Sequence, residues 1–300
     1  MNQPTRMVNY NPKIWFELIF HSYSKQVVRT LLPALVFLAV FSAVVCYTVL
    51  DLIDLEPHEF PGSTAVHSLL GIVLGLFLVF RTNSSYDRWW EGRRLWGGLV
   101  NSSRNFALKL HAALPLDHPD RTWFAVMTGN FAVALKEQLR RGVLVNELEV
   151  SDEHFAAEIQ QANHKPNRIS AMMYRRVEDL GRQGVLTSHQ LLNLDKELKD
   201  FTDILGACER IKKTPIPYSY MMYIKKFIFI YLITLPFGLI TTFGYFTIPT
   251  VLLVSFVLLS VELIAEEIED PFGRDINDLP TDELSETIRK NVKEILAART

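Results

Sequence analysis

The sequence predicts an all-α, multi-pass membrane protein. Three stretches of the 300-residue chain contain no Asp, Glu, Lys or Arg, namely residues 30–50, 60–80 and 227–261. A helix needs about 20 apolar residues to cross a bilayer, so the third stretch is long enough to cross twice. Few segments outside these stretches alternate with a period of two, which excludes an extensive sheet. We therefore expect four membrane spans and a large helical cytosolic region.

Residues 1–29 form the expected cytosolic or interfacial N-terminal segment. It begins polar and includes a short amphipathic, aromatic stretch at residues 13–21, typical of the headgroup layer. No cleavage site follows the first apolar stretch, so we expect that stretch to remain as an anchor. Lys25 and Arg29 precede it, and the loop after it contains no Lys or Arg. The positive-inside rule places the N-terminus in the cytoplasm and this loop outside. The acids of the loop are Asp51, Asp54, Glu56 and Glu59.

The second span, within residues 30–80, carries a stripe at i+4 steps, formed by Ser68, Ile72, Leu76 and Phe80. On a neighbouring face, Gly71 and Gly75 allow another helix to come close. Our hypothesis is that several copies of this helix surround an axis, with Ile72, Leu76 and Phe80 as an apolar constriction. From spacing alone, the stripe could equally face lipid or a packed neighbour.

Residues 81–226 are expected to form a helical cytosolic domain. Arg81, Arg88, Arg93 and Arg94 return the chain to the cytoplasm, and no proline occurs from residue 82 to 114. The second span should therefore continue as one long helix ending near Pro115. Further helices are expected at residues 121–145, from Ser151 and at 187–210, with a loop at 163–167 around Pro166 and a break at 212–217.

Residues 227–261 should form the third and fourth spans, joined by a short outside turn near Gly244 and Pro249. The remaining segment, residues 262–300, is an acidic loop followed by a cytosolic helix that Thr281 caps and that ends near Leu296. Both termini are then cytoplasmic. In the acidic loop, Asp275 and Asp278 follow the break at residues 271–273. They are either Ca²⁺ ligands or solvated carboxylates that pair with basic residues.

The motifs of common enzymes are missing. No GxxxxGK[ST], GxSxG or HExxH occurs, so we predict that the chain is not an enzyme. Nothing predicts nucleic-acid binding, and Cys46 and Cys208, the two cysteines, fall on different segments. His67 lies inside a span, where an ionisable group is either functional or neutral and bonded to a backbone carbonyl.

Three stretches resemble the bestrophins, in their bacterial branch. They are Arg-Trp-Trp-Glu at residues 88–91, Cys-Glu-Arg-Ile-Lys-Lys-Thr-Pro-Ile-Pro-Tyr at 208–218, and Glu-Ile-Glu-Asp-Pro-Phe-Gly-Arg-Asp-Ile-Asn-Asp at 267–278. The resemblance implies a homopentameric ion channel in the bacterial inner membrane with one central pore. It also implies that the second span lines an apolar neck, at Ile72, Leu76 and Phe80. A second constriction is expected at the cytosolic mouth, for which Leu186 is the matching choice.

The resemblance further implies a calcium clasp. Its side-chain ligands would be Asp275 and Asp278, with backbone carbonyls from Glu267 and Asp270. Arg274 stands where the animal members have an acid, and this positive charge weakens a Ca²⁺ site. No cofactor is therefore assigned from the sequence.

An apolar neck does not select the sign of an ion, so selectivity must come from the vestibules. The acidic outer loop favours monovalent cations such as sodium, whereas the animal bestrophins conduct anions such as chloride. Two other classes of function stay open. One is a membrane scaffold or assembly protein. The other is a secondary transporter, which would require repeats and broken helices, hinted at only by Pro236 and Gly238.

Overall fold

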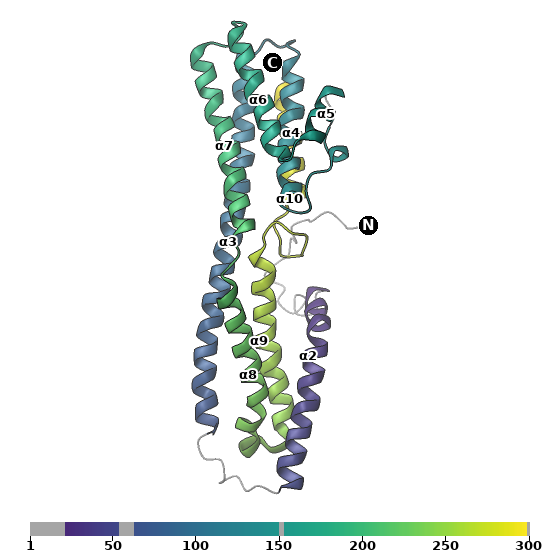
Figure 1. Ribbon diagram of the computed structural model, residues 1–300, viewed down its shortest axis with the longest axis vertical. Helices are drawn as coiled ribbons and strands as arrows, with labels where there is room; N and C mark the ends of the chain where they lie inside the picture. Colours follow the sequence, from purple (N-terminus) through teal and green to yellow (C-terminus); the bar gives the residue numbers. More distant parts are fainter. Residues whose placement is uncertain (1–21, 54–62, 150–152, 299–300) are drawn as a thin grey trace. The chain divides into compact units, whose positions relative to one another are not determined.

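The structure is a computed structural model that describes residues 22–53, 63–149 and 153–298 (Figure 1). The chain divides into two compact units. We call the first the membrane unit; its described residues lie within Asn9–Asp87 and Pro215–Glu269. We call the second the helical unit; its described residues lie within Arg88–Thr214 and Asp270–Thr300. The second span of the membrane unit ends at residue 87 instead of the predicted 80. The third span begins within a segment that starts at 215 instead of 227, and the fourth ends at 269 instead of 261. The reason is that the helices continue past their uncharged cores.

The membrane unit is built from helices. It contains α2 (Ser22–Tyr47) with a π-helical end (Thr48–Leu52), the first part of α3 (Ser63–Ala113), α8 (Tyr218–Phe243), a 3₁₀ turn (Gly244–Phe246) and α9 (Thr247–Glu269). Within the described residues, three stretches are long and apolar enough to cross a membrane: Gln26–Leu52, Ala65–Ala113 and Tyr218–Glu269. The last contains two helices, as expected for the region around residues 227–261.

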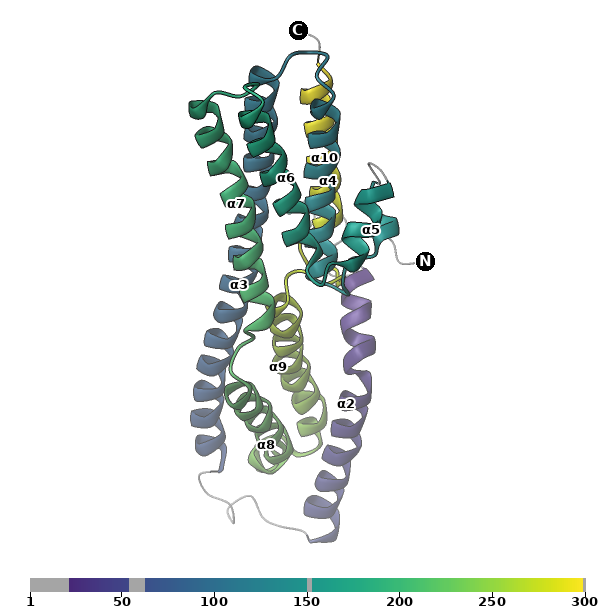
Figure 2. The ribbon, with the colours of Figure 1, turned by 45° about the horizontal axis from the view of Figure 1, so that its top comes forward.

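The turn between α8 and α9 falls where the sequence predicts it. Gly244 has φ +50°, a conformation that glycine adopts without steric cost. Figure 2 shows α8 and α9 side by side. Pro236 lies inside α8 without ending it, so the broken helix that a transporter would require is not found there. The core of this unit joins α3 to α8 through Leu74, Leu78, Ile224, Ile228 and Leu232.

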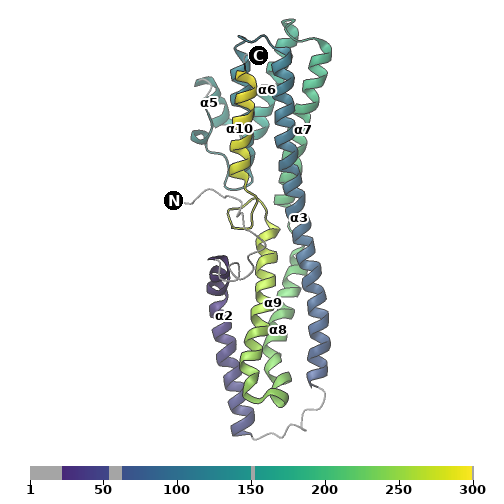
Figure 3. The same ribbon diagram turned by 180° about the vertical axis from the view of Figure 1, so that it is seen from behind.

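In its described residues, the helical unit contains the second part of α3 and six further elements. These are α4 (Asp120–Gln138), a 3₁₀ turn (Val145–Glu147), α5 (Glu153–Gln161), α6 (Lys165–Arg182), α7 (Ser188–Lys213) and α10 (Thr281–Ala297). The prediction of one long helix from the second span to Pro115 is confirmed, because α3 is continuous over 51 residues. Helices α3 and α7 lie side by side in Figures 1 and 3, and Lys109 of α3 pairs with Glu197 of α7 at 2.6 Å.

Most of the helix ends follow local signals. Thr187 caps α7 with a capping box, as expected. The predicted loop at 163–167 is confirmed only for residues 163–164, between α5 and α6. Residues 165–167 are helical, because Pro166 stands in the first turn of α6, where a missing N–H costs nothing. Helix α4 ends at Gln138 rather than 145, since Gly142 (φ +93°) turns the chain. The expected cap at Ser151 lies outside the described residues.

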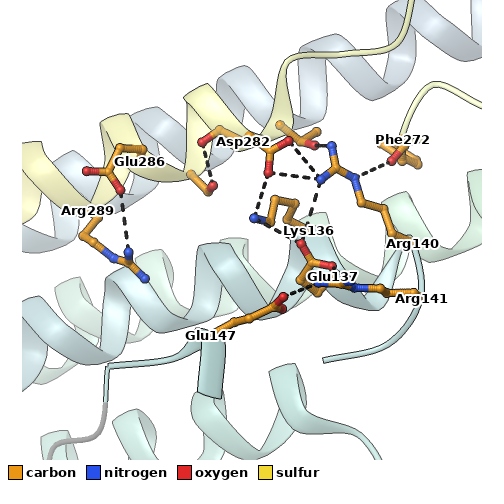
Figure 4. A network of polar contacts seen from close by, with 11 residues as sticks. Lys136, Glu137, Arg140, Arg141, Glu147, Phe272, Asp282, Glu286 and Arg289 are labelled. Carbon is orange, nitrogen blue, oxygen red and sulfur yellow. Dashed lines mark hydrogen bonds and ion pairs between the residues drawn. The ribbon is translucent and has the colours of Figure 1, made fainter. Parts of the chain in front are cut away.

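A polar network ties α4 to α10 and to the loop before α10 (Figure 4). Arg140, whose side chain is 4% exposed, donates to both carboxylate oxygens of Asp282 at 3.1 and 3.0 Å. Its Nε donates to the Phe272 carbonyl at 3.1 Å, and Lys136 pairs with Asp282 at 2.9 Å. The Asp282 carboxylate lies in the first turn of α10, where the helix dipole favours an anion. The N-cap residue of α10 is Pro280, so the prediction that Thr281 caps this helix is wrong.

Candidate functional site

The predicted neck residues form an exposed apolar stripe on α3. Ile72, Leu76 and Phe80 are 72%, 57% and 54% exposed in the single chain. The opposite face of the helix is buried, with Leu74, Leu78 and Arg81 at 0%, 3% and 0%. The three stripe residues therefore lie outside the core of the membrane unit, and this face is left for lipid, other copies of the chain or a pore.

Two glycines bring α3 close to α8. A Cβ atom at Gly71 would lie 2.9 Å from the Tyr231 hydroxyl, so the close approach predicted at Gly71 is confirmed. Gly75 has nothing within 4 Å of its Cβ position. On α8, a Cβ at Gly238 would lie 2.5 Å from Nδ1 of His67, whose ring is 6.1 Å from that of Tyr231. His67 thus packs at the interface between α3 and α8.

A buried ionic cluster follows the neck directly. Nη2 of Arg81 lies 2.8 Å from the Glu269 carboxylate and Nε lies 3.8 Å from that of Glu262. Arg81 also donates to Ser85, and Glu269 accepts the Ile216 backbone N–H at 3.0 Å. A buried charge needs an oppositely charged partner, so these ion pairs hold the Arg81 face of α3 against α9. From the sequence, Arg81 predicted only the cytoplasmic end of the second span, not these ion pairs.

Two other predicted positions differ in their exposure: Leu186 is buried and Asp51 is exposed. Leu186 is 3% exposed and belongs to the core of the helical unit, so its side chain is not free to line an aperture as placed here. Asp51 is exposed, and its carboxylate accepts a hydrogen bond from the Tyr245 hydroxyl. The other acids of the outer loop, Asp54, Glu56 and Glu59, lie outside the described residues.

Parts of the three family-like stretches meet in the helical unit, at what we call the signature junction. Arg88 donates to the backbone carbonyls of Ile211, at 2.6 Å, and Thr214. These carbonyls belong to the end of α7, where helical carbonyls lack intrahelical donors. The other contacts of the junction are Trp89 Nε1 with Asn277 O at 2.9 Å, Arg210 with Glu91 at 3.1 Å, Lys212 with Asp270, and Phe272 against Gly92.

The side chains of the acidic loop have contacts within the chain. Asp278 is 8% exposed and accepts the Asp275 backbone N–H at 2.6 Å, while the Asp270 side chain pairs with Lys212. The Asp278 carboxylate and the Asp270 carbonyl both lie near Gly273, since a Cβ atom at Gly273 would be 2.6 Å from Oδ2 of Asp278 and 3.9 Å from the Asp270 carbonyl oxygen. Among the described residues, no three His, Cys, Asp or Glu side chains group together.

The chain is similar to channel-forming proteins over most of its length. Residues 6–294 match the family described as Bacterial/Fungal Bestrophin protein. A voltage-dependent anion channel-forming protein of Nostoc sp. is 33% identical over 293 residues, covering 94% of this chain and 92% of that protein. One from Salmonella typhi is 33% identical over 279 residues, covering 91% and 89%.

A solved structure agrees with this likeness. A bacterial bestrophin homologue from Klebsiella pneumoniae superposes with a TM-score of 0.81 at 29% identity, covering 89% of this chain and 98% of that chain. A variant of the homologue from the same organism that carries one mutation gives 0.81 at 28% identity, covering 87% and 97%. The chain therefore belongs to the bacterial bestrophin family of multi-pass, channel-forming membrane proteins, and it is not an enzyme.

Proposed function

We propose that this chain is one subunit of a homopentameric channel that passes small monovalent ions, with Ile72, Leu76 and Phe80 as its neck. The observation that carries the proposal is the exposure of these three side chains, 54–72%, on a helix whose other face is buried. Five such helices around an axis would stack three apolar rings, one helical turn or about 6 Å apart. The names of the relatives, which are channel-forming proteins, support the same function.

The neck would gate by wetting. Its side chains have no charge and no hydrogen-bond donor, so water leaves a narrow apolar ring and returns when the ring widens. Such a gate opposes ions of either sign while it is dry. It therefore controls whether the channel conducts, and other residues control which ion it conducts.

Two observations support opposite signs of charge for the permeant ion. The relatives from Nostoc and Salmonella are named anion channel-forming proteins, which supports anion conduction. The acidic outer loop supports cation conduction, because a ring of carboxylates at an entrance concentrates cations. A reversal potential in planar bilayers under a gradient of one salt, such as KCl, decides between them: a potential close to the chloride equilibrium value rejects the cation-selective form.

The proposed location is the bacterial inner membrane, with both termini in the cytoplasm. Arg88, Arg93 and Arg94 after the second span and the acidic loop after the first support this orientation. Leu186 is not included in the proposed pore, since it lies in the core of the helical unit. We assign no residue to the cytosolic aperture.

A non-conducting scaffold is the main competing function, because an exposed apolar stripe can also pack against lipid or another chain. Leu76→Ala in the purified full-length protein tests this in planar bilayers. We expect a larger single-channel current or open fraction, since the ring becomes wider. Leu32→Ala on α2 is a matched control, because Leu32 is 51% exposed in the same unit. Unchanged currents in Leu76→Ala would favour the scaffold. Recording with Ca²⁺ and with a chelator should give the same current.

A further inference from the structure

The face of α3 that carries the neck continues toward the end of the membrane unit with two polar residues, Asn83 and Asp87. Helical residues advance by about 100° each. Measured from Ile72, Leu76 and Phe80 lie at about 40° and 80°, while Asn83 and Asp87 lie at about 20° and 60°. Both polar residues are exposed. They therefore fall inside the arc that the neck residues span.

Asp87 is the first charge on this face after the neck. Between Phe80 and Asp87 the only other charged residue is Arg81. Arg81 lies about 180° from Ile72, on the buried face, and pairs with Glu269. Its charge is thus directed away from the neck face and balanced by a carboxylate.

The Asp87 carboxylate is also free to act on ions. Among the residues that the structure describes, none forms a hydrogen bond or ion pair with it. By contrast, Glu266, an exposed carboxylate of the same unit, lies 3.1 Å from Lys225. An exposed carboxylate with no partner contributes its full charge to the local potential.

We propose that the Asp87 carboxylates of the assembled subunits form a charged ring next to the neck, which concentrates monovalent cations and raises the permeability to cations relative to anions. The inference rests on the proposed function, because only a neck-lining α3 brings the copies of Asp87 around one axis. Asp87 follows Phe80 by seven residues, a rise of about 10 Å. This is close to the Debye length of about 8 Å at physiological salt, so the ring acts on ions that approach the neck.

The test is a reversal potential of the full-length protein in planar bilayers under a KCl gradient, for wild type, Asp87→Asn, Asp87→Lys and Asp87→Glu. We expect Asp87→Asn to lower the ratio of K⁺ to Cl⁻ permeability at least about twofold, and Asp87→Lys to lower it further. Asp87→Glu keeps the charge and should keep the ratio. Glu266→Gln is the matched control and should also keep it. Raising the salt to 1 M, where the Debye length is about 3 Å, should shrink the difference.

Two results would overturn the inference, and they differ in what else they reject. If Leu76→Ala alters the current but Asp87→Asn and Asp87→Lys leave the permeability ratio unchanged, the neck stands and the charged ring is wrong. If Leu76→Ala has no effect either, the pore-lining role of α3 fails and the ring fails with it. Elution of each variant as the wild-type oligomer in size-exclusion chromatography confirms that the assembly is intact.

Discussion

Arg81 and Glu269 form a 2.8 Å ion pair with side chains 0% and 14% exposed, immediately after the last neck residue. The two residues are 188 positions apart in the chain. The pair fixes which way α3 is rotated, since a buried guanidinium must meet its carboxylates. When Arg81 points to α9, Phe80 and Leu76 must point away from the core. The orientation of the proposed neck residues is therefore set by a charge as well as by apolar packing.

We predict that Arg81→Met destabilises the membrane unit by about 3–5 kcal/mol, because Glu269 and Glu262 lose the cation between them in a buried place. Thermal unfolding of the detergent-solubilised protein measures this. Lys225→Met is the control, since its pair with Glu266 is exposed, 40% and 54%, and should contribute less than about 1 kcal/mol. Equal losses in the two variants would mean that the buried cluster has no special weight.

Arg88→Lys should loosen the last turn of α7. The guanidinium reaches two carbonyls at once, and an ammonium on a flexible stem cannot reproduce that fork. A hydrogen bond to a charged group contributes about 1.5–3 kcal/mol, so faster hydrogen exchange is expected near Ile211 and Thr214. Arg182→Lys on α6, where the arginine side chain is 76% exposed, should leave exchange unchanged. Unchanged protection in Arg88→Lys would contradict the capping role.

Much of this architecture could be predicted from local signals. The absence of proline after the second span predicted the length of α3, and the helical run over residues 187–210 predicted the start of α7 at Ser188, which Thr187 caps. Pro166 misled because a proline can open a helix as well as break one. The i+4 spacing also identified the stripe of Ile72, Leu76 and Phe80, whose exposure the structure gives.

What could not be predicted depends on which distant residues pair. The acidic residues after the fourth span could be recognised in the sequence, but no local pattern pairs Glu269 with Arg81 or Asp270 with Lys212. The same holds for Arg88, which was recognisable as a motif although its contacts with the end of α7 were not. Leu186 was chosen as the aperture residue from the family resemblance alone. Its side chain is 3% exposed, because the helices of the helical unit pack around it.

Gly238→Ala should weaken the contact between α8 and α3. The new Cβ would lie 2.5–3.0 Å from three ring atoms of His67, closer than van der Waals contact. Such overpacking costs about 1–3 kcal/mol. Gly75→Ala is the control, because nothing lies within 4 Å of its Cβ position, and it should be neutral or gain up to about 1 kcal/mol. The penalty of Gly238→Ala should shrink in a His67→Ala background; an equal penalty in both backgrounds would exclude the clash as its cause.

Cys208 should resist alkylation in the folded protein. Burial, aided by the nearby carboxylates of Glu91 and Glu209, raises the pKa of the Cys208 thiol to about 12, and the residue is 0% exposed. The thiolate is the reactive form, so raising the pH from 7 to 9 should leave labelling by a maleimide negligible, whereas a free cysteine, with a pKa near 8.5, becomes largely ionised. A Cys46→Ala background isolates Cys208, and Ser188→Cys in that background supplies an exposed thiol as a positive control. Denaturant should make Cys208 fully reactive. Rapid labelling without denaturant would show that the core between α3 and α7 opens readily.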